Sequence, residues 1–335
     1  MDKASPVLVE VTRGEAVESH HRGVVAVADA GGAIVAAWGD TERAVYPRSA
    51  IKPLQALPLI ETGAAEGFAL GDAEIALACA SHNGEAEHVA GIAAWLERVS
   101  LAADDLECGA QSPLGREAAL ARVRAGDAPS ALTNTCSGKH AGFLTTALHL
   151  GEETAGYIKR GHAVQRRVAE TLAEMTGCDV ATAPVAIDGC GIPTFAVPLA
   201  AVARAMARLA APDSLAPPRA AAARRIVAAM TAHPGLVAGR GRYDTAVMEA
   251  GRGAFVVKSG AEGFHAAIMP GLGLGCALKI EDGAGRAAEV AMTAVLRHLG
   301  VLDDHARTEM VDYLERPLVN WSGKRVGVIR ATLGS

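Results

Sequence analysis

The sequence lacks a long apolar run, an N-terminal export signal and a cysteine-rich pattern. No run of about 18 or more apolar residues occurs in its 335 residues, so we predict no membrane span. The opening stretch MDKASPVLVE has no apolar h-region, so we predict no signal peptide. Six cysteines are too few for a disulfide scaffold in a chain of this length. We therefore expect a cytoplasmic protein whose cysteines are free thiols or metal ligands.

The sequence also lacks a basic excess. Its net charge of −5 argues against a nucleic-acid-binding protein, which usually carries a surplus of lysine and arginine. Half of the residues are hydrophobic and 21% are charged, as in a folded globular protein. A chain of this length can bury enough apolar surface to enclose a water-poor pocket.

Short apolar or alternating runs near both ends predict β-strands, and Gly31-Gly32 predicts a hairpin between two of them. Ala- and Leu-rich stretches with helical periodicity fill the middle. The expected strands are 7–12, 23–30, 33–39, "AFVVKSG", "FHAAIMP", "GCALKIEDG" and "VGVIRATL". The expected helices are roughly 51–63, 85–98, 115–125, 139–149, 156–176, 194–210 and 216–232.

These elements predict an α+β fold in one domain, residues 1–335. We expect an antiparallel sheet built from about 1–45 and 250–335, with a largely helical part at about 50–235 packed on it. Residues near 50 and 258 would then meet where the helices join the sheet.

The stretch YPRSAIKPLQ places Ser49 three residues before Lys52. At this spacing in a first helical turn, the two side chains share one face, and a lysine with a lowered pKa can take the proton of a serine. The alternative is a helix-capping serine with a solvated lysine nearby. Taken alone, the pair does not decide between these interpretations.

Two further motifs favour catalysis. The stretch SHNG carries Ser81 and Asn83, and VVKSG ends a predicted strand with Lys258. Ser-x-x-Lys, then Ser-x-Asn, then Lys-Ser/Thr-Gly is the motif set of serine β-lactamases and penicillin-binding proteins. The three motifs occur here in that order.

A second cluster of reactive residues lies in TNTCSGKHAGF and IDGCGIPTF. Cys136, Lys139 and His140 come from the first stretch, and Asp188 and Cys190 from the second. Two thiolates and one nitrogen ligand suit zinc, with His140 a more conventional nitrogen ligand than lysine. Buried free thiols without a metal are the alternative.

The motifs YPRSAIKPLQ, SHNGE, TNTCSGKH, DGCGIPTF, GRYDT and KSGAEG together resemble the rhizobial-type L-asparaginases, the L-asparaginase II family. The likeness runs through nearly the whole chain, from ESHHRG to the last predicted strand. It implies a fold like that of the serine β-lactamases and glutaminases, and hydrolysis of L-asparagine to L-aspartate and ammonia.

The resemblance also implies the residues of the site. Ser49 with Lys52, and Ser81 with Lys258, become two catalytic Ser–Lys pairs. The implied ligands of one Zn²⁺ per chain are Cys136, Lys139 and Cys190. Which serine is acylated stays open, and we further expect a homodimer.

We expect a serine to attack the side-chain amide of asparagine, and zinc to support substrate positioning. Arg48 is expected to bind the substrate carboxylate and Asp188 its ammonium, with Asn83 and His140 as further substrate-binding residues. Glutamine or a β-lactam as substrate, a zinc-bound water as nucleophile, and a non-catalytic amino-acid sensor are the alternatives. The intact serines and lysines speak against a sensor.

Overall fold

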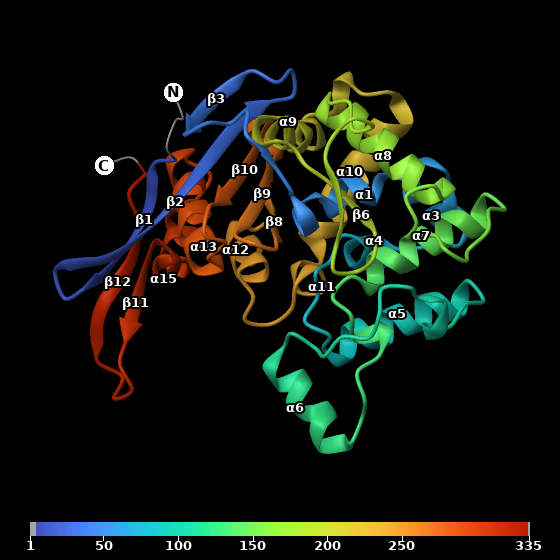
Figure 1. Cartoon of the computed structure of the whole chain (residues 1–335), viewed down its shortest axis with the longest axis horizontal. Coiled ribbons are helices and arrows are strands. Elements are labelled where there is room, and N and C mark those ends of the chain that lie inside the picture. The colour runs from blue at the N-terminus through green and yellow to red at the C-terminus, as the bar shows by residue number, and fades with distance from the viewer. Residues whose placement is uncertain (1–4, 334–335) are drawn as a thin grey trace. The chain divides into compact units, whose positions relative to one another are not determined.

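The computed structural model describes residues 5–333, and the chain divides into two compact units. We call residues 1–50, 197–211 and 246–335 the sheet unit, and residues 51–196 and 212–245 the helical unit. Figure 1 labels the elements of both. The single domain predicted for residues 1–335 stays a prediction, and residues 1–4 and 334–335 lie outside the described range.

The sheet unit is built on eight strands, and the neighbours in its sheet pair antiparallel. The order is β11-β12-β1-β2-β10-β9-β8, with β3 also paired to β2. Strands from both ends of the chain therefore share one sheet, as predicted. The strands are β1 (Val7–Arg13), β2 (Ala16–Asp29), β3 (Ile34–Trp38), β8 (Val256–Gly260), β9 (Phe264–Met269), β10 (Leu274–Ile280), β11 (Glu315–Val319) and β12 (Arg325–Ala331).

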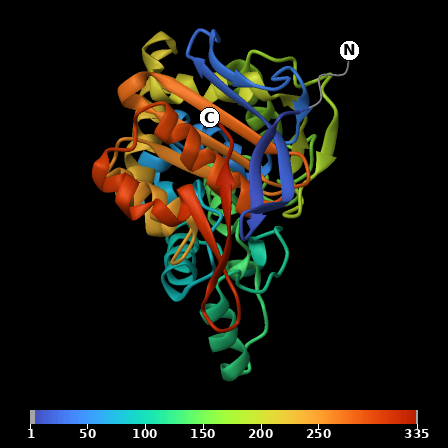
Figure 2. The ribbon, with the colours of Figure 1, turned by 90° about the vertical axis from the view of Figure 1, so that its left-hand side faces the viewer.

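The hairpin predicted at Gly31-Gly32 is confirmed. The Gly32 amide donates to Asp29 O at 3.0 Å, and β2 and β3 pair with Ala26 opposite Ala37. At the other end of the chain, β12 lies beside β1, and β11 forms the edge (Figure 2).

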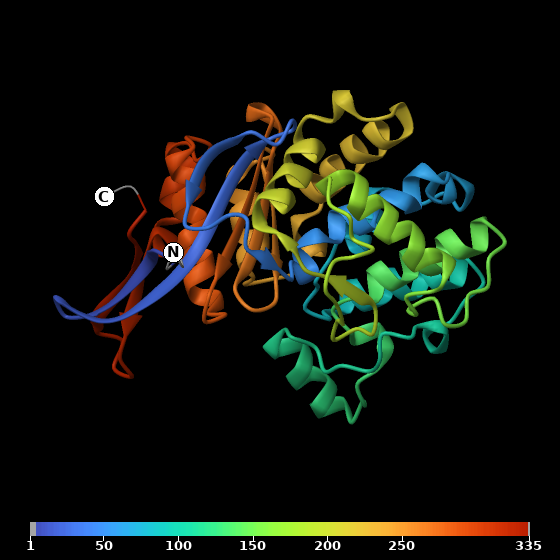
Figure 3. The ribbon, with the colours of Figure 1, turned by 45° about the horizontal axis from the view of Figure 1, so that its top comes forward.

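Two helices of the sheet unit pack on the sheet: α9 (Leu199–Ala210) and α13 (Gly285–His298) lie on either side of the strands (Figure 3). The approach of α9 depends on Gly275 in β10. A Cβ atom there would lie 2.2 Å from both Ala203 O and Ala207 N, so only glycine allows this contact. The unit is completed by β4 (Ala44–Val45), β7 (Val197–Pro198), α14 (Asp304–Glu309), α15 (Val311–Leu314) and most of α12 (Tyr243–Gly251).

The helical unit is organised around α7 (Ser137–His149), whose residues 137–147 are all buried. Helices α2, α3, α4, α5 and α8 contact it, so its polar first turn is enclosed by protein. The other helices are α1 (Lys52–Gln55), α2 (Leu57–Glu61), α3 (Ala64–Gly67), α4 (Asp72–Ala78), α5 (Ala86–Arg98), α6 (Arg116–Ala125), α8 (Ala163–Thr176), α10 (Pro217–Ala232) and α11 (Pro234–Val237). A two-stranded ribbon joins β5 (Val185–Ile187) to β6 (Pro193–Phe195).

The predicted α+β class and antiparallel sheet are confirmed, with three differences in detail. The expected helix 51–63 is broken into α1 and α2, and the expected helix 156–176 begins only at Ala163. The expected helix 194–210 begins at Leu199 and belongs to the sheet unit. Strand β11 and helix α13 were not predicted. Among residues 5–333, no helix is long and apolar enough to cross a membrane. The cytoplasmic location and the homodimer stay predictions.

Candidate active site

Lys52 is the first residue of α1 and is completely buried. Helix α1 follows the 3-10 turn Arg48–Ile51, and Pro53 is tolerated there because first-turn amides have no helical partner. All four residues of α1 are buried, so protein surrounds the lysine side chain.

The Lys52 amine has hydrogen-bond contacts with four groups, one of which is the Cys136 side chain. Its Nζ atom bonds to Ala80 O, lies 3.0 Å from Ser81 Oγ and lies 3.4 Å from Thr135 O. The two carbonyl oxygens only accept, whereas the Ser81 hydroxyl can also donate. A neutral Lys52 amine could therefore donate to the carbonyl oxygens and accept the Ser81 proton.

Burial lowers the pKa of the Lys52 amine below its ordinary value. The Cys136 thiolate raises that pKa but does not outweigh burial, and the positive charge of Lys139 lowers it further. The shift is toward the neutral form of Lys52, which is the form that can accept a proton.

Backbone hydrogen bonds hold the Ser81 segment on two sides. The amides of Ser81 and Asn83 donate to Val237 O and Ala238 O at 2.9 and 2.8 Å, and the His82 amide donates to Thr135 O at 3.3 Å. These three N–H groups are thus occupied, so donors to a substrate oxyanion have to come from elsewhere.

A close contact between two helices brings α7 to this segment. A Cβ atom on Gly138 would lie 2.2 Å from Leu77 O, near the end of α4. Glycine therefore lets the first turn of α7, which carries Cys136 and Lys139, approach the helix that leads into Ser81.

The three predicted metal ligands lie together. Cys136, Lys139 and Cys190 are all buried, and Lys139 Nζ donates to Cys190 Sγ at 3.0 Å. The Cys190 thiol donates to Cys136, which lowers the pKa of Cys136 well below its ordinary value and raises that of Cys190. Burial opposes the charge on Lys139, but the Cys190 and Cys136 sulfurs outweigh it and raise the pKa of Lys139.

Asn83, His140 and Asp188, the predicted substrate-binding residues of the helical unit, make different contacts. The Asn83 side chain donates to Arg240 O at 3.0 Å and accepts from Arg242 at 3.1 Å, so its amide orders the loop. His140 is fully buried; its Nδ1 lies 2.7 Å from Tyr157 Oη, and its Nε2 has no hydrogen-bond partner among the described residues. Burial lowers the pKa of His140, so the ring is neutral. Asp188 is half-buried and adds to the field that raises the pKa of Lys139.

Ser49, Lys258 and Arg48 belong to the sheet unit. The turn that holds Ser49 packs against the end of β8, because a Cβ on Gly260 would lie 2.6 Å from Pro47 O and 3.2 Å from Ala50 N. The predicted meeting of residues near 50 with the strand around 258 is confirmed at this contact. Lys258 is buried and donates to Ser259 O at 2.8 Å.

The structure adds a contact between the two expected Ser–Lys pairs. The pairings of Ser49 with Lys52 and of Ser81 with Lys258 stay predictions. The structure places Lys52 Nζ in hydrogen-bond contact with Ser81, 29 residues away in the sequence.

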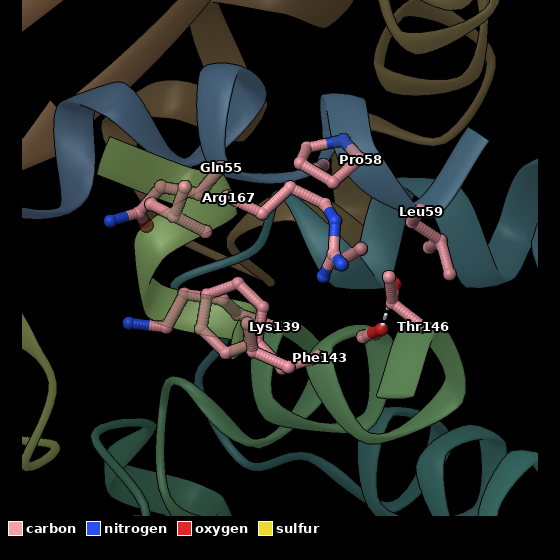
Figure 4. Close-up of a pocket in the computed structure, with 12 residues that line it drawn as sticks. Gln55, Pro58, Leu59, Lys139, Phe143, Thr146 and Arg167 are labelled. Atoms are coloured by element: carbon pink, nitrogen blue, oxygen red, sulfur yellow. Dashed lines mark hydrogen bonds between the residues drawn. The ribbon is translucent and has the colours of Figure 1, made fainter. Parts of the chain in front are cut away.

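A small cavity lies between α1, α2, α7 and α8, beside Lys139 (Figure 4). Gln55 and Lys139 direct their nitrogen atoms to one side, away from the Arg167 guanidinium. At about 10 Å³ the cavity has room for one water and none for an amino acid. It belongs to the packing around Lys139 and is too small for a substrate.

Sequence reasoning overlooked His82, which lies between Ser81 and Asn83 in the SHNG motif. Its Nδ1 accepts from the Gly84 amide at 3.0 Å, so Nε2 carries the proton and donates to Ser137 Oγ at 2.9 Å. His82 thereby ties the Ser81 loop to the first turn of α7. Burial lowers its pKa well below the ordinary value and keeps it neutral. The position of His82 between Ser81 and Asn83 could have indicated this role from the sequence.

The family model for L-asparaginase II matches residues 9–331. The chain belongs to the L-asparaginase II family. The match spans nearly all of the sequence and residues of both structural units. A search of curated proteins found no match.

Solved structures with a similar arrangement include the native form of Mglu and a beta-lactamase from Mycobacterium bovis. Mglu is 16% identical with a TM-score of 0.45, and the match covers 84% of this chain and 66% of that chain. The beta-lactamase is 15% identical with a TM-score of 0.42, and the match covers 87% of this chain and 94% of that one. The chain thus spans about two thirds of the length of Mglu.

Proposed function

We propose that this member of the family is an L-asparaginase that works through a serine acyl-enzyme, with Lys52 as the base. The observation that carries the proposal is the contact of Lys52 Nζ with Ser81 Oγ at 3.0 Å, made by a buried amine whose pKa burial has lowered. In its neutral form this amine can turn its lone pair to the serine proton.

In the first half of the reaction, Ser81 Oγ attacks the side-chain carbonyl carbon of asparagine as its proton passes to Lys52. The C–N bond then breaks, and the leaving nitrogen takes the proton from Lys52 and departs as ammonia. In the second half, water gives a proton to Lys52 and attacks the β-aspartyl ester. Aspartate leaves, and the proton returns to Ser81, so the enzyme is regenerated.

We assign the ester to Ser81 because the structure gives its distance to the base. Ser49 and Lys258 remain proposed catalytic residues on the strength of their motifs. Arg48 is proposed to bind the substrate carboxylate and Asp188 its ammonium, with Asn83 ordering the Ser81 loop and His140 supporting the substrate. Free asparagine carries a positive α-ammonium group and a negative α-carboxylate, so it needs one partner of each sign.

Zinc fits the cluster of Cys136, Lys139 and Cys190 by its donor set. Two buried sulfurs, one of them with a lowered pKa, are ligands that zinc prefers, and Lys139 Nζ, 3.0 Å from Cys190 Sγ, adds a nitrogen that can ligate as the neutral amine. A zinc ion bound there would supply positive charge for substrate positioning, and its charge would favour the neutral amine of Lys139 that ligation requires.

Metal content is the first prediction. We expect purified protein to carry close to one tightly bound zinc per chain, and Cys136→Ala or Cys190→Ala to lose it. Removal of zinc should raise KM by a larger factor than it lowers kcat, because the serine forms the covalent bond. Elemental analysis and kinetics on chelated protein measure both effects.

Cys178→Ala is the matched control, since Cys178 is half-buried and its thiol has only a weak local contact with Thr176 O. It should keep the zinc. Protein without stoichiometric metal would contradict the zinc site. Loss of all kcat on chelation, at saturating asparagine, would favour a zinc-bound water as nucleophile.

Substrate choice is the second prediction. We expect ammonia release to be fastest from L-asparagine, and slower from L-glutamine by about 10–200-fold in kcat/KM, the usual discrimination for one methylene. Parallel ammonia assays with both amino acids and a β-lactam test this. Equal or faster release from glutamine would make the protein a glutaminase and leave the acyl-enzyme proposal intact. No turnover of any of the three would contradict the proposed function.

A further inference from the structure

Three metal-ligating side chains lie at the start of α5, outside the site described above. Glu85, Glu87 and His88 each offer a ligand atom within 4.8 Å of the other two. Glu87 is exposed, Glu85 is half-buried and His88 is completely buried. The cluster is therefore open to solvent on one side and closed on the other.

The His88 ring presents a lone pair to the cluster. Its Nε2 lies 3.0 Å from Gly235 O, which can only accept, so Nε2 carries the proton. The other nitrogen, Nδ1, is buried and has no hydrogen-bond partner among residues 5–333. A metal-binding histidine typically has this arrangement, with one nitrogen donating to a backbone carbonyl and the other left for the ion.

Glu85 presents a second acceptor to the same space. Its Oε1 accepts from the Arg240 amide at 3.1 Å and from Asn83 at 3.3 Å. Its Oε2 is buried without a hydrogen bond and lies 3.9 Å from His88 Nδ1. Two buried acceptors thus face each other with no donor between them, which is costly unless something occupies the gap.

The helix dipole explains part of this cluster. Carboxylates are favourable at a helix N-terminus, and both glutamates lie in or before the first turn of α5. The dipole does not explain why His88 Nδ1 and Glu85 Oε2 lack donors. The Arg240 guanidinium, 4.0 Å from Oε2, is 88% exposed and can turn away into solvent.

We propose that Glu85, Glu87 and His88 bind a divalent first-row transition-metal ion. Two ligand atoms that each lie about 2.0–2.2 Å from one ion can be separated by up to about 4.3 Å, so the gap of 3.9 Å between Glu85 and His88 fits. The exposed Glu87 carboxylate turns inward as the third ligand, and water completes the shell. Imidazole and carboxylates without a thiolate suit Zn²⁺, Co²⁺ or Mn²⁺.

This site shares no ligand with the thiolate cluster. With two carboxylates and one imidazole it binds more weakly, and we expect it to be empty after gel filtration and to fill when metal is added. The bound ion clamps the loop that carries Asn83 to the start of α5.

Co²⁺ is the probe for this site. Zinc-loaded, full-length protein should take up one further equivalent of Co²⁺ in equilibrium dialysis, without the sulfur-to-cobalt charge-transfer absorption of a thiolate site. Glu87→Gln should weaken that uptake at least tenfold and leave asparaginase activity unchanged. Glu97→Gln, which alters another exposed glutamate of α5, is the matched control and should bind Co²⁺ as the wild type does.

Three results would overturn the proposal: no further uptake of Co²⁺, uptake that Glu87→Gln leaves unchanged, or uptake accompanied by the sulfur charge-transfer band. None of them bears on the acyl-enzyme, because the readout is metal binding. Loss of uptake in Glu87→Gln but not in Glu97→Gln supports it.

Discussion

Replacing Ser81 by alanine is expected to lower kcat for L-asparagine by at least about a thousandfold, the scale seen when a nucleophile is removed from a cooperating set. The substitution removes the proposed nucleophile, the hydroxyl that lies 3.0 Å from Lys52 Nζ. Folding should be nearly unaffected, because the change opens no large cavity. Steady-state kinetics and a thermal melt on the same preparation measure both effects.

Thr145→Val is the control for loss of a buried hydroxyl. Thr145 Oγ1 accepts from Trp95 Nε1 at 3.0 Å and donates to Ala141 O at 2.8 Å. This variant should melt earlier and keep its kcat. Ser49→Ala is expected to lose activity on the same scale as Ser81→Ala. If both serine variants kept more than about a tenth of kcat, a change of only about 1.4 kcal/mol in the barrier, the Ser–Lys account would be wrong.

Lys52→Arg is expected to be nearly as damaging as Lys52→Ala. Arginine keeps the positive charge but cannot be deprotonated in a protein, so it cannot take the serine proton. Measurement of kcat for both variants decides the role of Lys52. If the lysine acts only through its charge, Lys52→Arg stays largely active. Lys159→Arg, at an exposed position of the helical unit, is the matched control and should behave as the wild type.

The pH dependence of the activity is expected to follow from Lys52. As the proposed base, Lys52 can act only in its neutral form, so activity should be low below its pKa and should rise as the pH passes through that pKa. Because burial lowers that pKa, the rise should come at lower pH than the ordinary pKa of lysine, near 10.4. Profiles of kcat/KM against pH, taken over the pH range in which the protein stays folded, measure this pKa.

The sheet could be predicted from the sequence because most of its strands contain short apolar or alternating runs. The prediction failed where other signals conflicted. Strand β11 contains Pro317, which normally argues against a strand, yet β11 lies at the edge of the sheet, where a missing N–H is tolerated. Helix α9 was predicted as part of the helical middle. Its place on the sheet depends on Gly275, and no local pattern shows which helix will pack over a glycine.

The candidate site was predicted residue by residue, but its hydrogen-bond partners were not. Spacing along a helix predicts the pairing of Ser49 with Lys52. The contact of Lys52 with Ser81 depends instead on how α1 packs against the end of α4 and the Thr135 loop. Packing also brings Cys190 to Cys136 and Lys139, because Cys190 lies in a loop 51 residues after Lys139. Such long-range contacts are set by packing, which motif spacing does not describe.

The most direct test of the account is to trap the covalent intermediate. The protein is mixed with L-asparagine, quenched in acid within the first turnovers, digested and examined by mass spectrometry. We expect a peptide that contains Ser81 and carries one β-aspartyl ester. The same peptide of Ser81→Ala should carry no ester. An ester on Ser49 instead would contradict the assignment to Ser81, and rapid turnover with no acylated serine would contradict the acyl-enzyme itself.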